Sequence, residues 1–511
     1  MSVLKGLVLL LAAFAIACEV DETVNYIDDS YGETGLLTLS DDDQKLTLLR
    51  GLAADGLSSI DILVPVKRSN ESPAIIIEPD AEEWGEVEFV GKSAFESENF
   101  SFYRYRLTSE ESLPEALLAD SVASLSYSIL VSDDEGNALS LPLSVSVIRP
   151  AVIFVHGLAS NAATYDPMFG YIRPMGLYIE EALYAADYFT TSCASYATNI
   201  NVVPEAIAYT REALRDRGYV NEKFTLVGHS MGGILTRLYI QNEAVDYPYA
   251  GDILKIITID TPHSGSQLAD FALSLGDSES ILRIFSSMGA IVDLAVESEA
   301  TKSLNDSEKL AAANALKIPT HVISAHIGST MDVAQLVKDK QYLFALTTYL
   351  LNAVGQKYIY GDDSSDLVVP TRSQLGGVED TWRTNYVTTY SNEWHCSVLT
   401  TQQTAEGIVE LLNTASSDGA SFATDGFAPE ALSYTSEGGV SLVSSEALPA
   451  MSTIESQLLV GVDADGNLLQ AVYDDEPSEL LALDDESAVV CKIYIARLNS
   501  GEIYYNVVDN E

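Results

Sequence analysis

The sequence predicts an α/β protein in which a central domain with a mostly parallel, doubly wound sheet is flanked by an N-terminal β-sandwich-like domain and a small C-terminal β domain. Two patterns support this prediction. Residues 150–415 alternate continuous apolar runs with helical patterns, as strands buried on both faces and their covering helices do. Residues 35–149 and 416–511 hold short β-rich runs separated by turn-forming clusters.

The N-terminal domain is predicted from four β-rich runs, at Ile60–Val64, Ala74–Ile77, Val87–Val90 and Ser126–Val131. Turn-forming clusters such as Asp133–Asn137 bound the runs, and their regular spacing favours a β-sandwich over residues 35–149. Arg149-Pro150 is the expected hinge to the next domain.

The central domain, residues 150–415, is predicted to contain strands at Ala151–Val155, Phe224–Val227, Ile253–Ile259 and Pro319–Ile327. Helical patterns cover Pro204–Arg217 and Leu235–Asn242. Two insertions, between Ser266 and Pro319 and over Thr330–Val354, contain further apolar and helical stretches. They are expected either to form a lid and pocket or to pack as ordinary helices on the sheet.

The C-terminal domain, residues 416–511, is predicted from β-runs at Gln457–Val462, Leu468–Val472, Val489–Ala496 and Ile503–Val508. Asp463–Asn467 lies between the first two runs. It lacks the ligand spacing of a calcium loop and indicates a hairpin turn.

The charge balance excludes some partners. Among 511 residues, 75 are acidic and 27 basic, which gives a formal net charge of −48. Such a surface repels phosphate backbones and anionic lipid headgroups, so nucleic-acid binding and polybasic membrane docking are excluded as main activities. The net charge is −18 over residues 1–150, −14 over 151–415 and −16 over 416–511, which places most of the acid on the two flanks.

The first residues predict export. Lys5 is followed by the apolar run Gly6–Ala17, which is long enough for a signal peptide and too short for a membrane-spanning helix. The run ends in Ala15-Ile16-Ala17-Cys18, which resembles the lipobox of bacterial lipoproteins. The resemblance implies a signal peptide over residues 1–17, a lipid anchor on Cys18 and a tether over residues 18–34 in the bacterial cell envelope. Cleavage after Ala17 without lipidation, giving a secreted protein, is the alternative.

The remaining cysteines are Cys193, Cys396 and Cys491. Cys193 and Cys396 could form a disulfide in an exported protein, or both could be buried free thiols. The chain has no C-x-x-C pair and therefore no sequence signal for a zinc site.

The strongest chemical motif is Gly228-His229-Ser230-Met231-Gly232, which lies between a predicted buried strand and a predicted helix. This placement is typical of a nucleophile elbow, in which a sharp turn exposes the serine hydroxyl. Glycines are needed at both ends because the strand and the helix approach closely there. The helix start then offers the N–H of Met231 to an oxyanion.

A second motif is the strand end His156-Gly157-Leu158. Gly157 lets the chain turn so that the N–H of Leu158 points into the site as the partner of the Met231 N–H. His156 is expected to shape the loop without transferring protons.

With these motifs and Thr261-Pro262-His263-Ser264-Gly265-Ser266, residues 150–415 resemble the lipase branch of the α/β-hydrolase superfamily. The segment is similar to that of bacterial triacylglycerol lipases, lecithin–cholesterol acyltransferase-like proteins and inositol-deacylase-like proteins. The usual glycine before the threonine is Asp260 here.

The family order of Ser, Asp and His implies a catalytic triad of Ser230, Asp366 and His395. Of the six histidines, His395 alone follows the acid candidates in the sequence, and Asn392–Ser397 resembles the family's terminal catalytic loop. His326 is its nearest rival, with a structural role as the alternative. Asp366 aligns with the acid of Asp-Gly-x-Val-Pro, although Leu367 replaces the glycine; Asp363 and Asp362 remain alternatives.

The predicted activity is the hydrolysis of carboxylic esters through an acyl-enzyme, without a cofactor or metal. Acyl transfer or thioester cleavage by the same residues is an alternative within the class. A binding or adhesion protein on a hydrolase scaffold is the alternative from another class, and the β flanks would then bind a surface or polymer.

Overall fold

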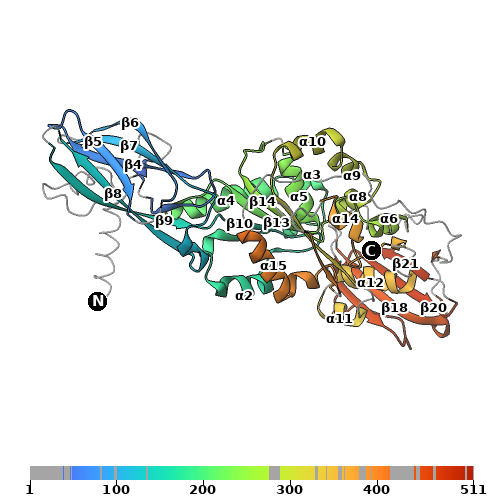
Figure 1. The fold of residues 1–511 in the computed structure, drawn as a ribbon. Helices are drawn as coiled ribbons and strands as arrows, with labels where there is room; N and C mark the ends of the chain where they lie inside the picture. Colours follow the sequence, from blue (N-terminus) through green and yellow to red (C-terminus); the bar gives the residue numbers. More distant parts are fainter. Residues whose placement is uncertain are drawn as a thin grey trace, which may run out of the picture. The chain divides into compact units, whose positions relative to one another are not determined.

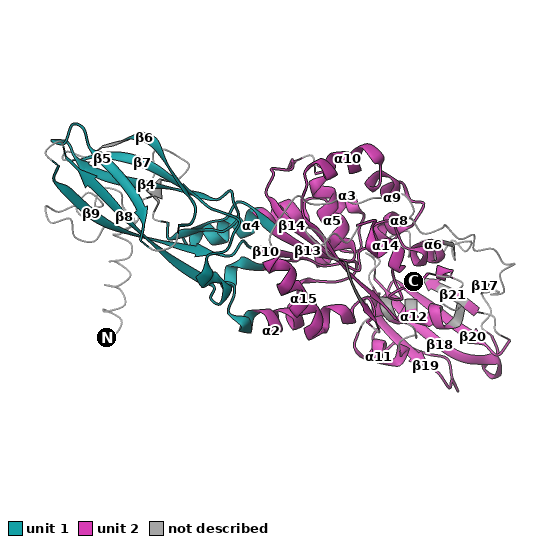
Figure 2. Ribbon diagram, viewed as in Figure 1, with its two compact units in different colours: residues 1–151, 173–183, 208–224 teal, residues 152–172, 184–207, 225–511 magenta. Residues whose placement is uncertain are grey.

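The computed structural model describes residues 38–39, 46–47, 49–80, 83–96, 100–133, 136–244, 246–274, 288–327, 332–340, 342–354, 359–361, 363–378, 387–391, 393–414, 442–444, 449–463, 468–500 and 503–509 (Figure 1). The predicted signal peptide, Cys18 and the tether lie outside these residues, and so do Asp362 and Asn392. The chain forms two compact units (Figure 2). Unit 1 consists of Met1–Ala151, Arg173–Leu183 and Ala208–Phe224, and unit 2 of Val152–Ile172, Tyr184–Ile207 and Thr225–Glu511.

Unit 1 contains two sheets, with strand orders β12–β3–β9–β8–β5 and β4–β7–β6, and a short pair β1–β2. The strands are β1 (Thr38–Leu39), β2 (Leu46–Thr47), β3 (Gly51–Ala53), β4 (Ser59–Lys67), β5 (Ala74–Pro79), β6 (Glu86–Glu96), β7 (Phe100–Thr108), β8 (Val122–Ser132), β9 (Ala138–Ile148) and β12 (Tyr219–Val220). Side chains of both sheets join one core, in which Ile62 and Val64 of β4 cluster with Leu141 and Val145 of β9. All four predicted β-runs are confirmed as strands, while β7 and β9 were not predicted.

The alternation of buried and exposed residues along β9 is typical of a strand with one face on the core, and β9 forms a hairpin with β8. In β9, Leu141, Leu143, Val145 and Val147 are buried, and the residues between them face outward or are half-buried. The two strands pair in antiparallel register from Val122 with Ile148 to Ser132 with Ala138.

A buried carboxylate ties the segment 208–224 to the sandwich. Asp55 accepts hydrogen bonds from the N–H groups of Ser58, Glu222 and Lys223 at 2.6, 2.9 and 2.9 Å. Next to it, β12 pairs with β3 in parallel. A segment from the middle of the sequence therefore completes the N-terminal sheet.

Unit 2 is built on a six-stranded sheet with the order β11–β10–β13–β14–β15–β16. These strands are β10 (Val152–Val155), β11 (Leu183–Ala186), β13 (Phe224–His229), β14 (Ile253–Ile259), β15 (Thr320–His326) and β16 (Val387–Ser391). β10 pairs with β13, β14 with β15 and β15 with β16, each in parallel. The four predicted strands are confirmed, and β11 and β16 were not predicted.

Helices accompany this sheet, as the alternating pattern predicts. They are α2 (Asp166–Ile172), α3 (Tyr196–Asn199), α4 (Val202–Asp216), α5 (Met231–Ile240), α6 (Gln267–Ser274), α8 (Gly289–Leu294), α9 (Glu299–Leu304), α10 (Ser307–Ala315), α11 (Val333–Lys338), α12 (Tyr342–Val354), α14 (Thr371–Leu375) and α15 (Gln402–Asn413). The described residues of the first insertion include α6, α8, α9 and α10, and those of the second include α11 and α12. Among the described helices, none combines the length and the apolar character that crossing a membrane requires.

The C-terminal strands form a five-stranded sheet with the order β17–β21–β20–β18–β19. They are β17 (Leu442–Ser444), β18 (Ile454–Val462), β19 (Leu468–Asp474), β20 (Cys491–Leu498) and β21 (Ile503–Asp509). The four predicted runs are confirmed. The Tyr349 hydroxyl of α12 donates to the carbonyl of Ser456 and accepts from the N–H of Arg497, both at 2.9 Å, so this sheet is fastened to the second insertion.

Candidate active site

Ser230 lies in the turn between β13 and α5, with a φ of 53° that side-chain-bearing residues rarely adopt. A Cβ atom on Gly228 would lie 2.6 Å from the backbone of Gly233, and one on Gly232 would lie 2.0 Å from the carbonyl oxygen of Val155. The two glycines therefore permit the contact of strand and helix that makes the turn sharp, as predicted from the motif.

The loop after β10 packs directly on the serine. A Cβ atom on Gly157 would lie 2.7 Å from Cβ of Ser230. Leu158 follows in this loop and lines the same cavity as Ser230, while Met231 begins α5. The structure thus brings the two predicted oxyanion-binding segments together beside the serine.

The predicted acid and base are in contact. Nδ1 of His395 donates to Oδ2 of Asp366 at 2.7 Å, and both side chains are buried. The N–H groups of Val368 and Val369 donate to Oδ1 of Asp366 at 2.8 and 2.7 Å. Leu367 has a φ of 78°, so it keeps the backbone conformation that the family's glycine would favour.

The alternative acids and bases do not share this contact. Asp363 carries a buried oxygen without a hydrogen-bond partner in the described structure, and burial raises the pKa of its carboxyl. His321 is buried in β15, where burial first and then the charge of Lys255 lower its pKa to about 3. His326 ends the same strand, and neither histidine lines the cavity described below.

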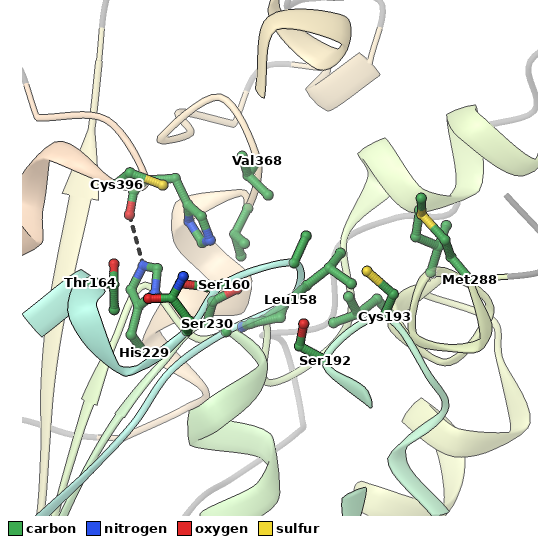
Figure 3. Close-up of a pocket in the computed structure, with 18 of the residues that line it drawn as sticks. Leu158, Ser160, Thr164, Ser192, Cys193, His229, Ser230, Met288, Val368 and Cys396 are labelled. Carbon is green, nitrogen blue, oxygen red and sulfur yellow. Dashed lines mark hydrogen bonds between the residues drawn. The ribbon is translucent and has the colours of Figure 1, made fainter. Parts of the chain in front are cut away.

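His229 supports the loop that carries His395. Its Nε2 donates to the carbonyl oxygen of His395 at 2.7 Å (Figure 3). Burial, and next the charge of His395, hold the pKa of His229 well below its usual range, so the ring is neutral. A neutral ring that donates at Nε2 has an accepting lone pair at Nδ1.

His156, for which a loop-shaping role is predicted, packs against the loop residue Tyr188. Its ring stacks on Tyr188 with centroids 4.0 Å apart, and the N–H of Tyr188 donates to Nε2 at 3.2 Å. Burial lowers the pKa of this histidine more than the nearby Asp187 raises it. The neutral ring of His156 thus packs within the loop.

A cavity of about 520 Å³ opens onto Ser230 and His395. Its walls are mostly apolar and include side chains of the loop after β10, α6 and α8: Leu158, Leu268, Ala272, Met288, Ile291 and Leu294. Lys340 and Tyr342 of the second insertion and Leu468 of β19 also line it. The described lining contains no aspartate or glutamate side chain.

The insertions therefore divide between the two roles predicted for them. Residues of α6 and α8 form cavity wall, and Met288, directly before α8, is seen among the lining side chains in Figure 3. In the second insertion, Tyr342 reaches the cavity, whereas Tyr349 packs against the C-terminal sheet.

Cys193 and Cys396 both line the cavity, and both are free thiols. The disulfide that was considered for them does not form. Burial raises the pKa of each thiol, which keeps both protonated and weakly nucleophilic.

Asp260 was noticed in the sequence only as a departure from the family pattern. The structure places it at the C-terminal end of β14, fully buried, with a φ of 47°. The Asp366 carboxylate influences its pKa, so the two carboxyls are neighbours. A carboxylate directly after a buried parallel strand is the signal that could have revealed it, because such strand ends gather functional residues.

No metal site is assigned around these groups. Ligand atoms of His229, Asp260 and His395 lie within 4.8 Å of one another. However, Nε2 of His229 and Nδ1 of His395 already form hydrogen bonds, and the proposed chemistry needs the other nitrogen of His395.

Residues 150–317 match the family model described as the PGAP1-like alpha/beta domain. Together with the parallel sheet and the strand–turn–helix around Ser230, this match decides the fold. The central domain has the α/β-hydrolase fold. The predicted fold class and the resemblance to lipases and esterases of this superfamily are confirmed.

Several solved structures are similar to this chain. Lipase BlEst2 from Bacillus licheniformis in mature form is 22% identical over 52% of this chain and 91% of that chain, with a TM-score of 0.35. Phospholipase PlaB from Legionella pneumophila is 14% identical over 70% and 89% of the two chains, with a TM-score of 0.36. Lipase 1 from Pelosinus fermentans is 16% identical over 52% and 98%, with a TM-score of 0.31. No curated protein matches this chain in sequence.

Proposed function

We propose that this chain is a serine hydrolase that cleaves carboxylic esters with an apolar acyl group, and that Ser230, His395 and Asp366 form its catalytic triad. The observation that carries the proposal is the 2.7 Å contact of His395 with Asp366, beside a cavity that also exposes Ser230 on a strained turn. Strain of this kind is concentrated at functional sites.

The proposed reaction runs through an acyl-enzyme. Asp366 holds the proton on Nδ1 of His395, so Nε2 accepts the Ser230 proton as Oγ attacks the ester carbonyl. The N–H groups of Leu158 and Met231 donate to the developing oxyanion. His395 then protonates the leaving alcohol. Water, activated by the same histidine, releases the carboxylic acid and restores Ser230.

The cavity supports an apolar acyl group. Its described walls carry no carboxylate, and the side chains of Met288, Ile291 and Leu294 are largely removed from solvent around it. Burying a CH₂ group of a substrate in such surroundings contributes about 0.8 kcal/mol. Longer acyl chains should therefore bind more tightly until the cavity is filled.

The test is hydrolysis of p-nitrophenyl esters of increasing chain length by wild type and Ser230→Ala. Wild type should hydrolyse them, and Ser230→Ala should lower kcat/KM about 10⁴-fold or more. Ser303→Ala, at an exposed position of α9, is the matched control and should retain wild-type rates.

Two results would contradict the proposal. Activity that survives in Ser230→Ala would show that another group is the nucleophile. A wild type that turns over no ester of any length would favour a binding protein on a hydrolase scaffold.

We also propose that the chain is exported and anchored through a lipid on Cys18. The support is the sequence of Met1–Cys18 with its positive start, apolar run and Ala17-Cys18 junction. In a bacterial host, wild type should incorporate labelled palmitate and sediment with membranes, and Cys18→Ala should do neither. Equal labelling of both proteins would refute the anchor.

A further inference from the structure

Asp260 is a buried carboxyl that the proposed triad does not use. Its side chain is fully buried, and neither of its oxygens has a hydrogen-bond partner at normal geometry in the described structure. A buried polar group without partners costs free energy, and an ionised one costs far more. The protein therefore keeps a costly group directly beside its proposed catalytic centre.

The surroundings of Asp260 belong to the proposed site. One of its oxygens lies within 4.8 Å of ring nitrogens of both His229 and His395. The charged or titratable groups that face it come from three segments: Asp366 of the acid loop, Glu393, His395 and Cys396 of the base loop, and His229 at the end of β13.

The two neighbouring carboxyls receive unequal numbers of hydrogen bonds from the protein. Asp366 receives three hydrogen bonds, from the N–H groups of Val368 and Val369 and from Nδ1 of His395. Asp260 receives none at normal geometry, because the nearby N–H of Ala325, which favours its ionised form, donates to Oε1 of Gln374 at 2.9 Å. Two adjacent carboxyls share a negative charge poorly, so the proton resides on the one whose anion is less well stabilised.

We propose that Asp260 is a protonated positioning residue of the catalytic site, which confines the site's negative charge to Asp366. This inference rests on the proposed function. As a neutral carboxylic acid, Asp260 has an O–H donor to offer, and the neighbouring Asp366 carboxylate is an acceptor for it. A hydrogen bond to Asp366 would hold the residue that contacts His395.

The electrostatics agree with this assignment. Burial first, and then the charge of Asp366, hold the pKa of Asp260 well above its usual range. Because the folded-state pKa is raised, the folded state loses stability as the pH rises above about 4, the unfolded value of an aspartate. Removing the carboxyl should therefore stabilise the fold at neutral pH.

The test compares wild type with two variants. Asp260→Asn keeps a hydrogen-bond donor but cannot ionise, and Asp260→Ala has neither a donor nor an ionisable group. The readout is the rate at which Ser230 reacts with a fluorophosphonate between pH 5 and pH 9, because this probe reports the serine's activation without a natural substrate. Infrared difference spectra of the same full-length proteins report the C=O stretch of a protonated carboxylic acid.

If Asp260 is neutral, Asp260→Asn should react within about threefold of wild type and keep the midpoint of the acidic limb, while the infrared band disappears. Asp260→Ala should react about tenfold more slowly, because the positioning donor is lost. If Asp260 is ionised, Asp260→Asn removes a negative charge beside His395 and should move that midpoint down by about one pH unit. Such a shift, an unchanged infrared band, or a wild-type rate in Asp260→Ala would overturn the proposal.

Failure of the proposed function gives a different result. If Ser230 of wild type does not react with the probe at any pH, the hydrolase proposal fails and the positioning role fails with it. The infrared band is measured without any reagent, so it still decides whether Asp260 carries a proton.

Discussion

Four side-chain-bearing residues near the proposed site have positive φ values: Ala159 at 51°, Ser230 at 53°, Asp260 at 47° and Leu367 at 78°. Each such conformation costs about 1–2 kcal/mol. Three of the four end a strand of the sheet or lie in the acid loop, where buried neighbours hold them in place. The strained conformations therefore lower the stability of the fold while they fix the orientation of a few groups.

Gly157 offers a direct test of how closely the loop after β10 approaches the nucleophile. In Gly157→Ala, the new Cβ would lie 2.7 Å from Cβ and 3.2 Å from Oγ of Ser230. We expect kcat on p-nitrophenyl esters to fall about 100-fold, since the hydroxyl is pushed away from its reactive position. Gly170→Ala in α2 is the matched control, because a Cβ there meets open space. Equal losses in both variants would show that the close approach is not what matters.

His321 predicts a pH dependence of stability. Its folded-state pKa of about 3, lowered by burial and then by Lys255, lies below the usual value of about 6.5. The unfolded chain therefore binds the proton first as the pH falls from about 6.5 toward 3, and the folded state loses about 1.4 kcal/mol per pH unit from this group. Denaturant unfolding of His321→Gln should show a shallower loss over that window, and an unchanged slope would contradict the assignment.

At the scale of elements, a buried arginine of α5 contributes to the attachment of the first insertion to the sheet layer. Arg237 donates to the carbonyl oxygens of His263 and Leu304, both at 3.1 Å, and to the side-chain oxygen of Asn305 at 3.0 Å. Asn305 in turn donates to the His263 carbonyl at 2.9 Å. The end of α9 is thereby fixed, and with it the helices that form cavity wall.

Arg237→Gln should release this attachment. The substitution removes the charged hydrogen bonds to His263, Leu304 and Asn305, so we expect a loss of about 2–4 kcal/mol in the free energy of unfolding. Denaturant unfolding measures this loss. The substitution should also raise KM more for long-chain esters than for short-chain esters, because the cavity wall loosens. Arg173→Gln, at an exposed position, is the control and should change stability by less than about 0.5 kcal/mol.

For the whole molecule, the C-terminal sheet is more than an appended domain. Leu468 of β19 lines the cavity, and Tyr349 of α12 bonds to β18 and β20 through its hydroxyl. The ring of Tyr349 also lies 5.9 Å from that of Tyr473 in β19. The most acidic part of the chain per residue thus reaches the cavity through an apolar side chain, that of Leu468.

Tyr349→Phe tests this attachment. The substitution removes the partner of the Arg497 N–H and of the Ser456 carbonyl, so we expect a loss of about 1–2 kcal/mol. Limited proteolysis should then release the C-terminal sheet faster than in wild type. Tyr247→Phe, at an exposed position, should be cleaved at the wild-type rate. Identical digestion of all three proteins would show that the hydroxyl does not fasten the sheet.

Much of the fold could be predicted from local patterns. Continuous apolar runs marked β10, β13 and β14 because each of these strands is buried on both faces. β11 and β16 were missed. β11 is only four residues long, with half-buried residues at its centre, and a strand at the edge of a sheet needs no continuous apolar run. β9 was also missed, although its alternation of buried and exposed residues is typical of a strand.

The sequence by itself determined the α/β class and the elbow around Ser230, because glycine spacing and apolar periodicity act over a few neighbouring residues, and the resemblance to the family's Ser, Asp, His order implied His395. Only the tertiary structure decided that Asp366, and not Asp363, faces His395, and that Asp260 lies beside both. Those relations join segments that are about 30 to more than 130 residues apart in the sequence. Which side chains meet across such distances depends on the order of the strands in the sheet, and local sequence patterns do not determine that order.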